Sequence, residues 1–188
     1  MKKKLAIFIS GRGSNMNALI SACATGILKD VAEIVLVFSN KVNAAGLDTA
    51  HAAGLTTIAF SSKGKKRTTF DREIVSMLSL EQPDYIILAG YMRVLSPVLV
   101  EAYKGRIINI HPADTQEHQG LDGYEWAFEK GLETTKITVH YVDEGLDTGQ
   151  IIAQYPVDLR GATSLDEVKH RGLAVEHTSY SQAIKSIL

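Results

Sequence analysis

Short, almost wholly apolar runs that each end in a small polar segment constrain the fold of this chain more than any other feature. The clearest run, Leu5–Ile9, is followed at once by the glycine-rich segment Gly11–Asn15 and then by apolar residues at helical spacing. Continuous apolar runs of this kind are typical of strands buried on both faces of a parallel sheet. The segment therefore predicts a strand, a glycine loop and a helix, in that order.

The same alternation continues along the chain. We expect further strands at 34–38, 56–60, 85–89, 107–110, 137–142 and 150–157, and helices at 44–53, 68–80, 97–103, 124–130 and 164–188, the last as one helix or two. Strands that alternate with helices indicate right-handed βαβ units. The sequence thus predicts an α/β fold: a doubly wound, mostly parallel, Rossmann-like sheet with helices on both faces. We expect one domain over residues 1–188.

Charge and cysteine content exclude several classes of protein. The 188 residues carry 20 basic and 21 acidic side chains, a balance that gives little support to nucleic-acid binding. Cys23 is the only cysteine, so an intramolecular disulfide and a cysteine-based metal cluster are excluded. No apolar stretch reaches the roughly 20 residues of a membrane span. The lysines before Leu5 lead into a strand rather than a signal peptide. We expect a cytoplasmic protein that does not bind membranes.

Four polar segments follow strands of the predicted sheet, namely Gly11–Asn15, Ser39–Asn40, Gly90–Arg93 and Asn109–Pro112. Ligands of open α/β sheets bind beyond the carboxyl ends of the strands, so these segments are expected to line one crevice. Gly11–Asn15 suits a phosphate cradle, because glycines let the backbone approach an anion at a helix N-terminus. An ordinary strand-to-helix turn explains the same residues equally well.

Asn109 and His111 are separated by one residue in a predicted strand, so their side chains point to the same side. Two polar side chains at the end of a buried strand need partners, and those are either a ligand or the backbone. Asp147 is a third candidate, because a carboxylate beside His111 would raise the pKa of the imidazole and favour the cation. Its neighbour Gly149 also allows Asp147 to be a simple turn residue. Local sequence does not bring Asp147 to His111.

Several motifs together resemble one family, the glycinamide ribonucleotide transformylases, which are folate-dependent formyltransferases of purine synthesis. The matching stretches cover nearly the full length in order and lie at residues 9–15, 37–41, 88–97, 105–112, 138–140 and 144–152. The resemblance implies 10-formyltetrahydrofolate as cosubstrate and 5-phosphoribosylglycinamide as acceptor, with no metal. The alternative that His111, His140 and Asp147 form a metal site has little support beside this resemblance. A homodimer is compatible with these expectations.

The resemblance also implies the site residues. It assigns catalysis to Asn109, His111 and Asp147, and substrate binding to Gly13, Ser14, Asn15 and Glu176. It assigns folate binding to Arg67, Met92, Arg93, Val94, Leu95, Asn109, Val142, Asp143 and Glu144, in a loop that continues to Asp147. In this mechanism the acceptor amine attacks the formyl carbon. Asn109 and protonated His111 donate hydrogen bonds to the developing oxyanion, and Asp147 passes a proton to the leaving nitrogen.

One segment departs from the family pattern. After His111-Pro112 the family usually continues Ser-Leu-Leu-Pro, an aromatic residue and then glycine, whereas this chain has the polar stretch Ala113–Gln119 before Gly120. We favour a tolerated variant over a changed acceptor or a loss of activity. Within the stretch, Asp114 and His118 are expected to be solvated loop residues rather than substrate contacts. The chain also ends earlier than is usual in the family.

Other functions of the same residue set remain open. Methionyl-tRNA formyltransferase, formyltetrahydrofolate deformylase and sugar-nucleotide amine formyltransferases share the catalytic trio, but they carry appended domains that are not expected in these 188 residues. A non-catalytic nucleotide- or folate-binding module would keep the glycine turn without turnover. Turnover of the folate with and without the acceptor amine separates these alternatives.

Overall fold

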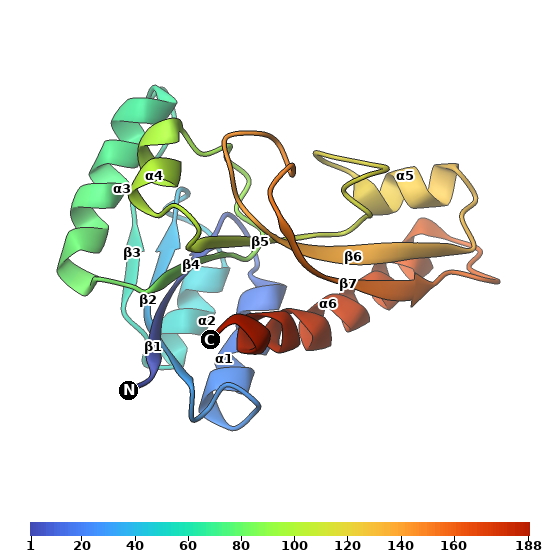
Figure 1. Ribbon diagram of the computed structural model, residues 1–188, viewed down its shortest axis with the longest axis horizontal. Coiled ribbons are helices and arrows are strands. Elements are labelled where there is room, and N and C mark those ends of the chain that lie inside the picture. Colours follow the sequence, from blue (N-terminus) through green and yellow to red (C-terminus); the bar gives the residue numbers. More distant parts are fainter.

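The computed structural model describes all 188 residues and confirms the predicted doubly wound α/β architecture (Figure 1). Seven strands form one sheet in the order β3-β2-β1-β4-β5-β6-β7. The strands are β1 (Lys3–Ile9), β2 (Ala32–Ser39), β3 (Thr57–Ala59), β4 (Tyr85–Leu88), β5 (Ile107–His111), β6 (Thr134–Tyr141) and β7 (Ile151–Asp158). Neighbours from β3 to β5 pair in parallel, and β6 and β7 pair antiparallel.

Helices cover both faces of this sheet. They are α1 (Ser14–Ala24), α2 (Gly46–Ala52), α3 (Arg67–Glu81), α4 (Pro97–Ala102), α5 (Gly123–Glu129) and α6 (Leu165–Ile187). The C-terminal segment is therefore one helix, and its start is capped as the sequence suggests: the Ser164 hydroxyl accepts from the N–H of Glu167 at 3.2 Å. No helix is long and apolar enough to cross a membrane.

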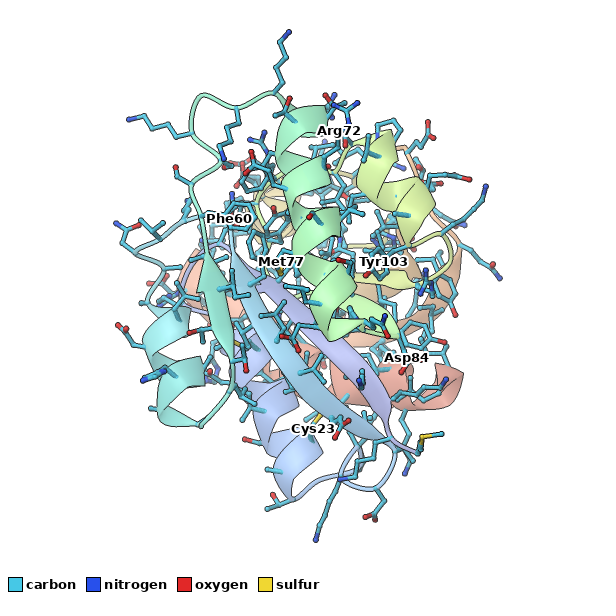
Figure 2. All side chains as sticks on the ribbon, turned by 90° about the vertical axis from the view of Figure 1, so that its left-hand side faces the viewer. Cys23, Phe60, Arg72, Met77, Asp84 and Tyr103 are labelled. Carbon is cyan, nitrogen blue, oxygen red and sulfur yellow. The ribbon has the colours of Figure 1, made fainter.

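Alternation along β1 divides its side chains between two apolar cores. Leu5, Ile7 and Ile9 pack into the core beneath α1 and α6, whereas Ala6 and Phe8 pack into the core beneath α3 and α4. Figure 2 looks onto the second layer, where Met77 on α3 and Tyr103 after α4 are labelled. Because both faces of β1 are buried, its sequence needs the continuous apolar run from which the strand was predicted.

Tyr180 fastens α6 to the middle of the sheet. Its side chain is 1% exposed, and its hydroxyl lies 2.9 Å from the carbonyl oxygen of Leu88 and 3.1 Å from that of Ile108. These two residues lie on the neighbouring strands β4 and β5. The contact therefore fixes α6 against the strands whose carboxyl ends carry the polar segments.

Replacing Tyr180 with phenylalanine should lower the free energy of unfolding by about 1–3 kcal/mol, because the hydroxyl donor is lost from a buried site. Urea denaturation measures the change. Tyr155→Phe is the matched control, since the Tyr155 side chain is half-buried and its hydroxyl makes no hydrogen bond. Equal stability of the two variants would contradict this role for the Tyr180 hydroxyl.

Candidate active site

The polar segments after β1, β2 and β4 meet at one edge of the sheet, as the crevice argument predicts. The Ser10 hydroxyl donates to Asn40 Oδ1 at 2.6 Å and accepts from the N–H of Met92 at 2.8 Å. The N–H of Ser10 also donates to the carbonyl of Gly90 at 3.1 Å. Asn109 lies beside the end of β4, paired with Leu88. Four segments that are distant in sequence therefore surround one site.

Asn109 and His111 on β5 lie on the same side of the sheet, and the antiparallel partner β6 places His140 opposite Asn109. The loop between β6 and β7 brings Asp147 onto this group. Asp147 Oδ1 accepts from the Asn109 amide at 3.2 Å, and its Oδ2 lies 3.5 Å from His111 Nδ1. The structure thus assembles the three residues to which catalysis was assigned, although sequence alone does not connect them.

Two backbone features allow Asp147 to reach this position. The residue itself has φ of 54°, in the left-handed region that aspartate tolerates better than most residues. At Gly149, a Cβ atom would lie 1.7 Å from the carbonyl oxygen of Tyr141, so only glycine lets the loop return this close to β6. The carboxylate is then secured by the N–H of Gly120, which donates to Oδ2 at 2.9 Å.

Burial sets the protonation of this group. Burial alone would raise the pKa of Asp147, but the neighbouring His140 side chain and the N–H of Gly120 outweigh it and lower that pKa. Asp147 is therefore a carboxylate. The expectation that it holds His111 cationic is wrong: burial of His111, which is 3% exposed, lowers the pKa of the imidazole below 6.5 despite the opposing effects of Asp147 and of the His118 carbonyl.

The partners of His111 identify its tautomer. The carbonyl oxygen of His118 lies 3.0 Å from His111 Nε2 and can only accept, so Nε2 carries the proton. The 3.5 Å between Nδ1 and Asp147 Oδ2 is too long for an ordinary hydrogen bond, which agrees with an unprotonated Nδ1. His140 Nδ1 likewise donates to the carbonyl of Tyr141 at 2.8 Å, and its Nε2 lies 3.3 Å from the Asn109 amide nitrogen and 3.5 Å from Asp147 Oδ1.

A cavity of about 450 Å³ opens onto the trio. Of the residues to which folate binding was assigned, its wall contains Met92, Arg93, Val94, Leu95, Asn109, Val142 and Asp143. Glu144 and Arg67 are exposed and lie off this wall. The basic loop before Arg67 is joined to the wall, however, because Arg93 donates to the carbonyl of Lys65 at 2.9 Å. Exposed Met92 and Leu146 give part of the wall an apolar surface suited to a planar ring.

The glycine turn leaves helix α1 open to an anion. Gly13 precedes the helix with φ of 71°, and no side chain caps the first turn. The first N–H groups of α1 therefore have no partner inside the helix, and the side chain of Ser14 is exposed beside them. At Gly46, a Cβ atom would lie 3.0 Å from the carbonyl oxygen of Gly11, so α2 packs closely against the turn and holds it.

Glu176 lies next to this turn, buried in α6 at 5% exposure. Its Oε2 accepts from the Asn15 amide at 2.5 Å and its Oε1 from the Tyr124 hydroxyl. Burial raises the pKa of Glu176, and the two donors oppose that effect. Tyr124 fits only because residue 172 is glycine, since a Cβ atom there would lie 2.1 Å from the tyrosine ring. Sequence reasoning missed Tyr124, which has no local signal beyond its place in a helix.

The expectation for Asp114 is also wrong. It was expected to be a solvated loop residue, but it is 5% exposed and forms an ion pair of 2.7 Å with Lys136 on β6. His118 is half-buried, with its ring stacked on Trp126 at 4.9 Å between centroids. No group of three histidine, cysteine or acidic side chains is arranged to hold a metal ion.

Comparisons with known proteins define the class. The model of a family described as formyl transferase matches residues 3–184. The chain is 38% identical over 181 residues to the phosphoribosylglycinamide formyltransferase of Escherichia coli (strain K12), covering 96% of this chain and 84% of that protein. It is 37% identical over 190 residues to the protein of the same name from Bacillus subtilis (strain 168), covering 99% and 95% of the two chains.

A solved structure agrees with these relatives. Glycinamide ribonucleotide transformylase 1 from Geobacillus kaustophilus superimposes with a TM-score of 0.94 and 36% identity, over 100% of both chains. The chain therefore belongs to the formyl transferase family.

The pKa of His111 should show that burial outweighs the charge of Asp147. We expect a pKa below 6.5 by NMR, and a still lower one in Asp147→Asn, because that variant removes the nearby negative charge. Since the folded pKa is depressed, the contribution of His111 to stability is present above about pH 6.5 and is lost as pH falls through the folded pKa. A wild-type pKa above 6.5 would show that the charge of Asp147 dominates instead.

Proposed function

We propose that this protein transfers the formyl group of 10-formyltetrahydrofolate to the amine of 5-phosphoribosylglycinamide in purine biosynthesis. Membership of the formyl transferase family supports the reaction type, and the named relatives support the acceptor. The observation that carries the proposal is the convergence of Asn109, His111 and Asp147 at a cavity near an open helix N-terminus. Residues 1–188 act as one formyltransferase domain in the cytoplasm, and a homodimer is compatible with this activity.

The donor folate occupies the cavity beside Met92–Leu95, with Arg93 and the loop 142–147 toward the pterin and Arg67 as a further folate contact. The acceptor's phosphate binds the N–H groups of Gly13–Asn15, where no side-chain cap competes. Glu176, fixed by Asn15 and Tyr124, holds the sugar end of the acceptor. This arrangement directs the acceptor amine toward the trio from one side and the formyl group from the other.

The chemistry follows from the charges of the trio. The amine nitrogen attacks the formyl carbon, and negative charge develops on the formyl oxygen. The Asn109 amide, whose protein contacts of 3.2 and 3.3 Å are long and easily exchanged, donates to that oxygen. The same negative charge raises the pKa of His111, whose Nδ1 takes up a proton from water at this stage and returns it when the oxyanion collapses. Asp147 takes the amine proton and delivers it to the folate nitrogen as the carbon–nitrogen bond breaks.

Asn109→Ala should lower kcat by about 10²- to 10³-fold, the usual effect of removing one oxyanion donor. Consumption of 10-formyltetrahydrofolate is followed with and without the acceptor amine. Asn43→Ala is the control, because Asn43 is exposed and lies off the cavity wall.

Turnover that requires the amine supports the proposal. Folate loss without the amine would identify a hydrolase, and binding of folate without any turnover would identify a binding module. Unchanged kcat in Asn109→Ala would refute the role of its amide.

A further inference from the structure

The polar stretch Ala113–Gln119, where this chain departs from the family pattern, is fastened to the sheet by one buried carboxylate. Asp114 Oδ1 accepts from the N–H of Gln116 at 3.0 Å and from the Gln154 amide at 2.9 Å. Its Oδ2 accepts from Lys136 at 2.7 Å. Lys136 belongs to β6 and Gln154 to β7, so Asp114 binds both strands of the antiparallel end of the sheet.

Neighbouring contacts extend this anchor. The Thr138 hydroxyl donates to the carbonyl of Ala113 at 2.7 Å and accepts from the Gln154 amide at 3.1 Å. Burial would raise the pKa of Asp114, but the hydrogen bonds from Lys136, Gln116 and Gln154 outweigh it and lower that pKa. Asp114 is thus an anion whose oxygens are satisfied by protein donors, which a buried carboxylate requires.

The other end of the stretch delivers two backbone groups to the catalytic trio. The carbonyl of His118 lies 3.0 Å from His111 Nε2, and the N–H of Gly120 donates to Asp147 Oδ2 at 2.9 Å. The link to the anchor is direct, because the N–H of His118 donates to the backbone carbonyl of Asp114 at 2.9 Å. The place of the His118 carbonyl therefore depends on where Asp114 is held.

We infer that Asp114 is a positioning residue for the catalytic histidine. Through the segment 114–120 it holds the His118 carbonyl on His111 Nε2 and the Gly120 N–H on Asp147. The first contact fixes the imidazole tautomer and ring orientation, and the second keeps Asp147 ionised. A histidine whose ring is displaced by about 1 Å loses much of its catalytic effect. The catalytic consequence rests on the proposed function, whereas the placement of the His111 ring does not.

The experiment compares Asp114→Ala, Asp114→Asn and Lys136→Gln with the unmodified protein. We expect Asp114→Ala to lower kcat about 10- to 100-fold while the KM values of both substrates change much less, because reacting groups are misplaced rather than ligands lost. Lys136→Gln should have a smaller effect in the same direction, and Lys136→Arg should restore activity. Asp158→Asn is the control, since Asp158 forms an exposed ion pair of 2.7 Å with Arg160 and lies off the cavity wall.

A second measurement reads the imidazole directly. The ¹⁵N resonances of His111 should report one tautomer, protonated at Nε2, in the unmodified protein and a mixture in Asp114→Ala. If Asp114→Ala is too unstable to study, Asp114→Asn and Lys136→Gln give the same comparison.

The outcomes separate the two proposals. A lower melting temperature with unchanged kcat and unchanged His111 resonances would overturn the positioning role and leave Asp114 as a structural anchor. Altered His111 resonances in a protein whose unmodified form shows no turnover would support the positioning of His111 and refute the proposed function.

Discussion

The site depends on the contacts of one buried group, the carboxylate of Asp147. Its side chain is 10% exposed, and a buried anion is stable only where donors surround it. Asn109 on β5, Gly120 in the preceding loop and His140 on β6 face this one group. These contacts therefore hold three segments of the chain around one carboxylate. The position of each segment in the site depends on its own contact with Asp147.

The sheet supplies the frame for this contact, and most of the frame could be predicted. Leu5–Ile9 is apolar at every position because both faces of β1 are covered, so the strand and its burial on both faces follow from the local sequence. The side shared by Asn109 and His111 follows from strand periodicity. Both inferences need only residues close together in the sequence.

Asp147, Glu176 and Asp114 show where such reasoning ends. Asp147 reaches Asn109 across 38 positions of the chain, through a loop whose path depends on the close approach allowed at Gly149. The partners of Glu176 lie 161 and 52 positions away, at Asn15 and Tyr124. The charge of His111 was misjudged for a related reason: a neighbouring carboxylate can be guessed from motifs, but the extent of burial that opposes it depends on the packed structure.

The altered loop illustrates the same dependence on distant partners. A carboxylate such as Asp114 in a buried loop would be unfavourable by itself. Its donors on β6 and β7 lie 22 and 40 positions further along the chain, and both strands pair side by side. The polar stretch is therefore stabilised by a polar contact in which Asp114 is the acceptor and Lys136 and Gln154 are the donors. Although this segment departs from the family pattern, its polar contacts to β6 and β7 hold the backbone of residues 118–120 against His111 and Asp147.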